Sequence, residues 1–128
     1  MIPQITKGIK VSVEVFFQDE YSKPLADQYV FSYRVTIENE SDRTVQLISR
    51  HWYIQDAGGS QREVKGEGVV GKQPVLHPGE SHQYVSWCPL NTTVGKMYGT
   101  YQMIDLELGD MFDVKIPEFR MAASFVLN

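Results

Sequence analysis

The sequence is poor in cysteine, in basic charge and in long apolar segments. Its 128 residues include one cysteine, which excludes an internal disulfide bond, and its net charge of -4 lacks the excess of lysine and arginine that nucleic-acid binding requires. No apolar run approaches the roughly 20 residues of a membrane-spanning helix, and residues 1–7 do not read as a secretory signal. We therefore expect a single domain, residues 1–128, in the cytoplasm, with no nucleic-acid partner and no membrane insertion.

Helical periodicity is also missing, and alternation of apolar and polar side chains takes its place. In the segment 9–17, for example, Ile9, Val11, Val13 and Val15 alternate with more polar neighbours, which is the period of a half-buried strand. A change of parity in the third strand predicts a bulge near residues 49–51. The expected strands are 9–17, 29–38, 44–55, 61–65, 83–88, 97–108 and 111–116, and a last one alternates through Phe119, Met121, Ala123 and Phe125. Pro89 and Pro117 are expected to end the strands before them.

About eight strands without a helix predict an all-β protein, an antiparallel two-sheet β-sandwich. Trp52 in the third strand and Tyr101 two residues before Met103 favour the immunoglobulin and fibronectin type III kind. The residues expected to contribute to its core are Val13, Val15, Tyr33, Val35, Ile37, Trp52, Tyr101, Met103, Val114 and Phe119.

A loop at residues 66–80 interrupts the strands with four glycines and two prolines. It contains Gly66, Gly68 and Gly71 in the spacing of the dinucleotide-binding fingerprint, but the helix that the fingerprint requires cannot follow because of Pro74 and Pro78. A tight loop that needs positive φ angles, a protein contact through Val69 and Val70, and an anion nest flanked by Lys65 and Lys72 are the three interpretations of this segment.

Carboxylates gather around the turn at residues 105–113. With a three-residue loop at 108–110, Asp105 would lie directly opposite Asp113 on the outer face of the sheet. Solvent or Lys115 would relieve their repulsion, and a weakly held magnesium ion is the alternative.

The remaining candidates give no catalytic or metal motif. His51, His77 and His82 lack metal-ligand spacing, and we expect them to be surface residues. Cys88 would be a nucleophile only if the fold brought a histidine beside it, so a buried thiol is the default. Arg50, near Trp52, is expected to stack on that ring or to bind a carboxylate. No cofactor is indicated.

Several of these motifs occur together at the spacing of one known family. They are Gly66–Gly71 with Gln73-Pro74, then Pro78-Gly79-Glu80 with Tyr84, Gly99-x-Tyr101-x-Met103, Ile116-Pro117-x-Phe119 and Gln46-Leu47-x-x-Arg50-x-Trp52. The chain closely resembles the ApaG family over nearly its whole length. This resemblance implies a small bacterial cytoplasmic protein with a fibronectin-like sandwich, linked to cobalt resistance and magnesium efflux, without an established enzymatic activity, and related to domains regarded as protein-interaction modules.

The preferred function is thus a noncatalytic interaction module and not an enzyme. Its unknown protein partner, or a second copy of the chain in a homodimer, would meet the loop formed by Gly66, Gly68, Val69, Val70 and Gly71 and the adjoining edge strand 61–65. The alternatives are weak binding of a divalent cation by Asp105 and Asp113, or binding of a nucleotide or polyphosphate by the glycine loop with Lys65 and Lys72.

Overall fold

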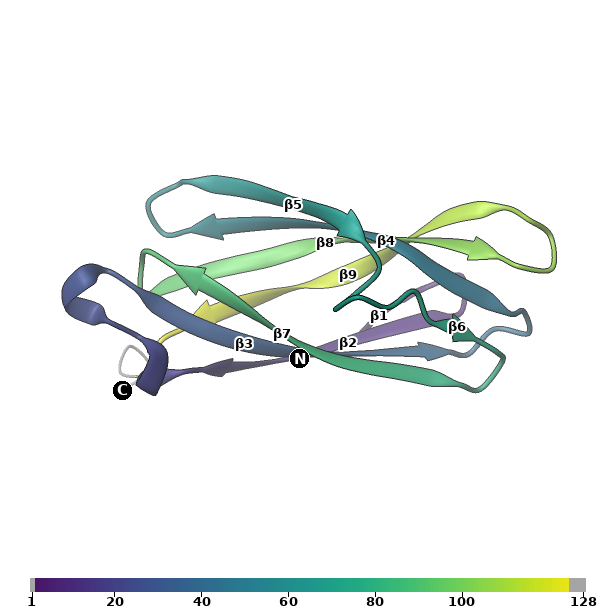
Figure 1. The fold of residues 1–128 in the computed structure, drawn as a ribbon, viewed down its shortest axis with the longest axis horizontal. Helices are drawn as coiled ribbons and strands as arrows, with labels where there is room; N and C mark the ends of the chain where they lie inside the picture. The colour runs from purple at the N-terminus through teal and green to yellow at the C-terminus, as the bar shows by residue number, and fades with distance from the viewer. Residues whose placement is uncertain (1, 125–128) are drawn as a thin grey trace.

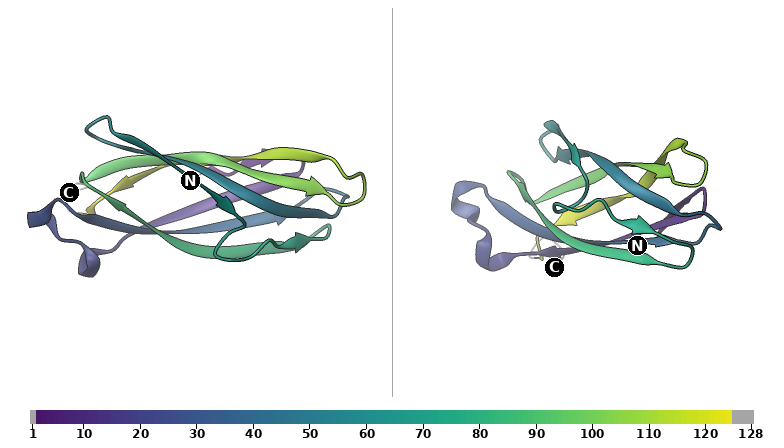
Figure 2. Two further views of the ribbon diagram at one scale, coloured as in Figure 1. Left: turned by 45° about the horizontal axis from the view of Figure 1, so that its top comes forward. Right: turned by 45° about the vertical axis from the view of Figure 1, so that its right-hand side comes forward.

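The structure is a sandwich of two antiparallel sheets (Figures 1 and 2), and the computed structural model describes residues 2–124. One sheet has the strand order β1-β2-β3-β7, and the other has the order β5-β4-β8-β9, with β6 also paired to β4. The strands are β1 (Gln4–Thr6), β2 (Ile9–Phe17), β3 (Tyr29–Asn39), β4 (Val45–Asp56), β5 (Gln61–Glu67), β6 (Val75–Leu76), β7 (Ser81–Leu90), β8 (Val94–Asp105) and β9 (Met111–Ala122). This confirms the predicted sandwich.

The order of the strands is that of an immunoglobulin-like fold. The strands β2, β3 and β7 take the places of A, B and E in one sheet, and β4, β8 and β9 take the places of C, F and G in the other. Between β2 and β3 run two short 3₁₀ turns, η1 (Asp19–Tyr21) and η2 (Pro24–Ala26), which extend beyond one end of the sandwich (Figure 1). No helix within residues 2–124 has the length and hydropathy to cross a membrane.

The core lies between the sheets and centres on Trp52. Its ring is 2% exposed and makes edge contacts with Tyr33, Tyr101 and Phe119, with ring centroids 5.4, 6.4 and 5.9 Å away. Such edge-to-face packing is the arrangement that the aromatic quadrupole favours. All predicted core residues are buried except Val15, which is partly buried and packs against the core.

The prolines were expected to end strands, and in this respect the prediction was wrong. Strand β7 continues through Pro89 to Leu90, and β9 continues through Pro117 to Ala122. Pro117 is tolerated because it lies where the register between β8 and β9 shifts, opposite the step from Met97 to Gly99. The predicted bulge in β4 is present, with the register shift between Leu47 and Ser49.

Other boundaries differ by a few residues. Strand β8 begins at Val94 and ends at Asp105, instead of running from 97 to 108, and the short strands β1 and β6 were not predicted. Gly66 belongs to β5, so the irregular segment begins after Glu67. The predicted position of Phe125 lies outside the described residues.

Candidate functional site

The glycine-rich segment folds into a two-residue hairpin turn. The N–H of Val69 donates to the carbonyl of Lys72 at 2.8 Å, and the N–H of Lys72 donates back to the carbonyl of Val69 at 3.1 Å. Val70 and Gly71, at the centre of the turn, have φ angles of 49° and 75°. Two positive φ angles define the type I′ turn, which normally takes asparagine, aspartate or glycine at its first central position. A β-branched valine occupies that position here.

The two valines do not form the exposed pair that we expected. Val69 is 1% exposed and belongs to the core, whereas Val70 is 62% exposed. The alternation of side chains across a turn explains the difference, because Val69 is a strand-like position and Val70 is at the tip. Any contact surface on this turn therefore consists of Val70, not of both residues.

The turn has few free amides for an anion. Besides the two N–H groups bonded across the turn, the N–H of Gly68 donates to the carbonyl of Ile48 at 2.8 Å. Gly68 also approaches Lys72 so closely that a Cβ atom would lie 2.3 Å from the Lys72 carbonyl oxygen. The glycines at 68 and 71 are thus accounted for by tight packing and positive φ angles, which is the first of the three interpretations.

Arg50 has a role that the sequence did not indicate. Its Nη1 donates to the carbonyls of Glu67 and Gly68 at 3.0 and 2.9 Å, so the guanidinium lies over the end of β5. A Cβ atom on Gly66 would lie 2.7 Å from Arg50 Nη2, which explains the glycine within this strand. We expected Arg50 to stack on the Trp52 ring or to bind a carboxylate, and its acceptors are backbone carbonyls instead.

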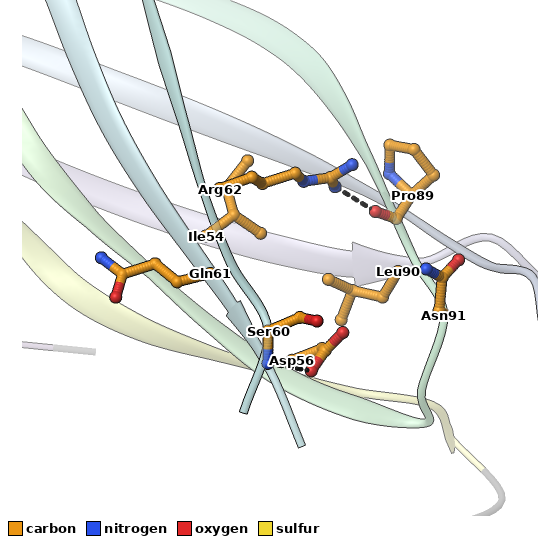
Figure 3. Close-up of a pocket in the computed structure, with 8 residues that line it drawn as sticks. All are labelled: Ile54, Asp56, Ser60, Gln61, Arg62, Pro89, Leu90 and Asn91. Carbon is orange, nitrogen blue, oxygen red and sulfur yellow. Dashed lines mark hydrogen bonds between the residues drawn. The ribbon is translucent and has the colours of Figure 1, made fainter. Parts of the chain in front are cut away.

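A second arginine joins the edges of the two sheets. Arg62 of β5 donates from Nη2 to the carbonyl of Pro89 in β7, as Figure 3 shows, and the same nitrogen lies 3.6 Å from Cys88 Sγ. Cavities of about 260 and 210 Å³ lie beside this contact. The first is lined by the eight residues drawn in Figure 3, and the second includes Arg50, Trp52, Val64, Trp87 and Cys88. We call this side of the molecule, between the edges of β5 and β7, the β5–β7 flank.

Cys88 is a buried thiol on this flank, at 2% exposure. Burial raises its pKa, and the nearby Arg62 only partly offsets that effect. A nucleophilic cysteine needs the opposite shift, toward the thiolate.

The two carboxylates proposed to hold a cation do not lie opposite each other, so the predicted pairing of Asp105 with Asp113 was wrong. Asp113 pairs with Gln102, and the N–H of Asp105 bonds the carbonyl of Asp110. Asp105 points into the sandwich at 9% exposure, where Oδ1 accepts hydrogen bonds from the N–H groups of Glu107 and Leu108. The turn closes three residues earlier than expected, so the parity of the strand places Asp105 on the inner face.

The histidines occupy separate places. His51 and His77 each lie beside a glutamate, with Nε2 of His51 2.8 Å from Glu63 and Nδ1 of His77 2.7 Å from Glu80. Partial burial lowers the pKa of His82, and the charge of Lys72 adds to this shift. Within residues 2–124 no three His, Cys, Asp or Glu side chains are grouped so as to hold a metal ion.

The fold and this flank define the chain as a fibronectin-like β-sandwich in which Arg62 links the edge strand β5 to β7 of the other sheet. The family model of the ApaG domain matches residues 19–105. Protein ApaG of Brucella abortus is 53% identical over 121 residues, which cover 94% of this chain and 92% of the relative. Protein ApaG of Brucella anthropi is 52% identical over the same lengths. The chain belongs to the ApaG family.

Solved structures also superpose on this fold. A Bordetella pertussis protein described as ApaA superposes with a TM-score of 0.88 and is 46% identical, covering 91% of this chain and 94% of its own. The C-terminal domain of Wzt superposes with a TM-score of 0.56 at 8% identity, over 96% of this chain and 77% of that one. The second similarity concerns the fold alone.

Proposed function

We propose that this chain is a noncatalytic protein-interaction module whose partner contacts Val70 at the tip of the 69–72 turn. The observation that carries the proposal is the conformation of Val70. A left-handed backbone costs an L-residue about 1–2 kcal/mol, and β-branched side chains are rare there. Val70 nevertheless adopts it, and its side chain is 62% exposed instead of filling the core.

Strain of this kind supports a functional role because stability alone favours another residue. Asparagine or glycine would satisfy the turn without the penalty, and neither would offer an apolar surface. The hydrogen bonds across the turn already hold Val70 in place, so the turn would lose little conformational entropy when a partner binds. The raised pKa of the buried Cys88 thiol supports the noncatalytic part of the proposal.

The family resemblance links such proteins with cobalt resistance and magnesium efflux. On this proposal, the link would pass through the protein partner and not through a cation bound to Asp105 and Asp113.

The test replaces Val70 by asparagine, which keeps the turn and removes the apolar tip. A photo-crosslinking residue at position 70, in the living bacterium, identifies the partner, and the affinity of the purified pair is then measured. Val70→Asn is expected to weaken binding at least ~10-fold while the free energy of unfolding stays equal or rises.

The matched control is Leu108→Asn, an exposed apolar residue at 58% exposure in the turn between β8 and β9. This substitution should leave the affinity unchanged. Equal affinity of the Val70→Asn variant, or crosslinks from position 108 but none from position 70, would contradict the proposed contact.

A further inference from the structure

The two strand edges of the β5–β7 flank differ in how well they are protected against pairing with another chain. Strand β5, with seven residues, carries the charged side chains of Arg62, Glu63, Lys65 and Glu67. Strand β7 has ten residues, Ser81–Leu90, and includes no aspartate, glutamate, lysine or arginine. Natural edge strands are kept from pairing with other chains by charges, prolines or short length. Strand β5 follows this rule, and most of β7 does not.

The outer edge of β7 offers backbone groups in a regular row. Strand β7 has only β3 as a strand partner among the described residues. The carbonyl of Pro89 accepts the hydrogen bond from Arg62 of β5, which places the backbone of Pro89 on the edge away from β3. In an antiparallel ladder alternate residues point their backbone groups to the same side, so Gln83, Val85 and Trp87 also direct theirs outward.

Apolar side chains accompany this row. Val85 and Trp87 are each 50% exposed, although both sit in a regular strand of the sandwich. Tyr21 of η1 contacts the Trp87 ring edge-on, with the centroids 5.3 Å apart, and is itself 60% exposed. An exposed, long and apolar edge is the feature that strand-addition partners recognise.

We propose that β7 pairs with β7 of a second copy of this chain, antiparallel and across a two-fold axis near Val85. The proposal rests on the proposed function of the chain as an interaction module, and it names one partner and the edge that the partner uses. Val85 would face Val85 of the partner subunit, and Gln83 would face Trp87 of the partner subunit. The ladder would end at Pro89, which has no N–H and whose carbonyl is already bonded to Arg62.

Charge complementarity favours a second copy as the occupant. The seam between the two β7 strands would hold no charged residue, and the neighbouring Glu14 and Arg34 already neutralise each other at 2.9 Å. Arg62 of β5 contacts Pro89 of β7, and Val64 lines one cavity with Trp87, so β5 runs antiparallel to β7 along the flank and Gly66 comes nearest to Val85 and the axis. Antiparallel approach of β5 about that axis brings Lys65 toward Glu67 of the partner subunit, and Glu67 toward Lys65 of the partner subunit.

The test uses a charge exchange at the axis. We expect the full chain to sediment and scatter light as a dimer, and we expect Val85→Lys and Val85→Glu each to weaken that dimer at least ~10-fold by setting like charges opposite each other. A mixture of the two variants should regain the mass of a dimer. Leu108→Lys, at a similarly exposed apolar position, is the control and should stay dimeric.

Hydrogen exchange provides a readout of the strand pairing itself. The amides of Gln83, Val85 and Trp87 should be protected in the dimer and should exchange rapidly in the Val85→Lys variant. A chain that is monomeric at every concentration would overturn the proposal, and so would a dimer that survives both substitutions. A monomer whose β7 amides become protected only when another protein is added would identify that protein as the occupant and would also overturn it.

The result of this test can be distinguished from the result of the test of the proposed function. Val70→Asn should leave the dimer intact, because Val70 lies outside β7. A monomeric chain that still loses its crosslinked partner on Val70→Asn would refute the β7 pairing and leave the interaction module standing.

Discussion

At the scale of single residues, Trp52 shows how much of the fold depends on one side chain. It is the largest of the fully buried residues and contacts rings from β3, β8 and β9, which come from both sheets. Its Nε1 has no hydrogen-bond partner among the described residues, so the ring contributes through packing alone. The change in the free energy of unfolding when Trp52 is replaced therefore reports the contribution of packing in the apolar core.

We expect Trp52→Ala to lower the free energy of unfolding by about 3–5 kcal/mol, because the apolar burial of the indole is lost and the neighbouring side chains fill only part of the cavity that it leaves. Urea denaturation followed by circular dichroism measures the change. Tyr21→Ala, at a 60% exposed ring, should cost less than about 1 kcal/mol in the Val85→Lys background. A loss at Trp52 as small as that at Tyr21 would show that the ring is not a core residue.

Gly66 and Arg50 form a pair whose coupling can be measured. The φ angle of Gly66 is not positive, so alanine meets no backbone obstacle there, but its Cβ would lie 2.7–2.8 Å from three guanidinium atoms. The guanidinium would have to leave the carbonyls of Glu67 and Gly68, and we expect Gly66→Ala to cost about 1–2 kcal/mol.

A double-mutant cycle isolates this contact. In an Arg50→Met background the obstacle is absent, so Gly66→Ala should cost only a few tenths of a kcal/mol. Gly58→Ala is a control, since its Cβ would make only an ordinary contact, at 3.4 Å from Asp56 Oδ1. Equal costs of Gly66→Ala with and without Arg50 would show that the arginine does not explain this glycine.

At the scale of the elements, the alternation of apolar and polar side chains predicted most strands. A strand that buries only one face must repeat its apolar residues at every second position. Strands β2, β3 and β4 were placed within one or two residues. Local sequence could not place Pro89 and Pro117, since a proline ends a strand only when its neighbour needs the missing N–H. That condition depends on the partner strand, which belongs to the tertiary structure.

The candidate site was predictable only in part, for a related reason. The sequence identified the glycine turn and the edge strand β5, because glycine and charge have local meanings. It could not separate Val69 from Val70, or assign Asp105 to the inner face, because a shift of one residue at a turn reverses every side chain that follows. The exposed edge of β7 was missed because exposure there depends on which strand ends the sheet.

At the scale of the whole molecule, the sandwich is held differently along its two sides. On the side of β1 and β9, the N–H of Lys115 donates to Thr6 Oγ1 at 3.2 Å. On the β5–β7 flank Arg62 links the two sheets, Arg50 holds the end of β5, and the phenol groups of Tyr33, Tyr84 and Tyr101 lie close by. The hydroxyls of Tyr84 and Tyr101 are hydrogen-bonded to each other between the sheets, and burial raises the pKa of all three phenols.

These phenols make the whole fold sensitive to alkali. Below pH 10, the ordinary pKa of tyrosine, the folded and unfolded chains both keep the protons, so stability is unaffected. Above it the unfolded chain loses protons that the folded chain retains, so the free energy of unfolding should fall by up to about 1.4 kcal/mol per pH unit for each phenol. Cys88, whose pKa is also raised, should begin this decline near pH 9.

Urea denaturation between pH 8 and pH 11 measures the slope, and tyrosinate absorbance measures ionisation in the folded state. Three of the seven tyrosines should ionise only as the chain unfolds. Replacing Tyr84 and Tyr101 together by phenylalanine removes both partners of their hydrogen bond, so stability at pH 8 should change little while the alkaline slope becomes shallower. If all seven phenols of the native protein titrated near pH 10 without loss of stability, then the tyrosines between the sheets would be open to solvent, and the β5–β7 flank could not be closed as the arginine contacts require.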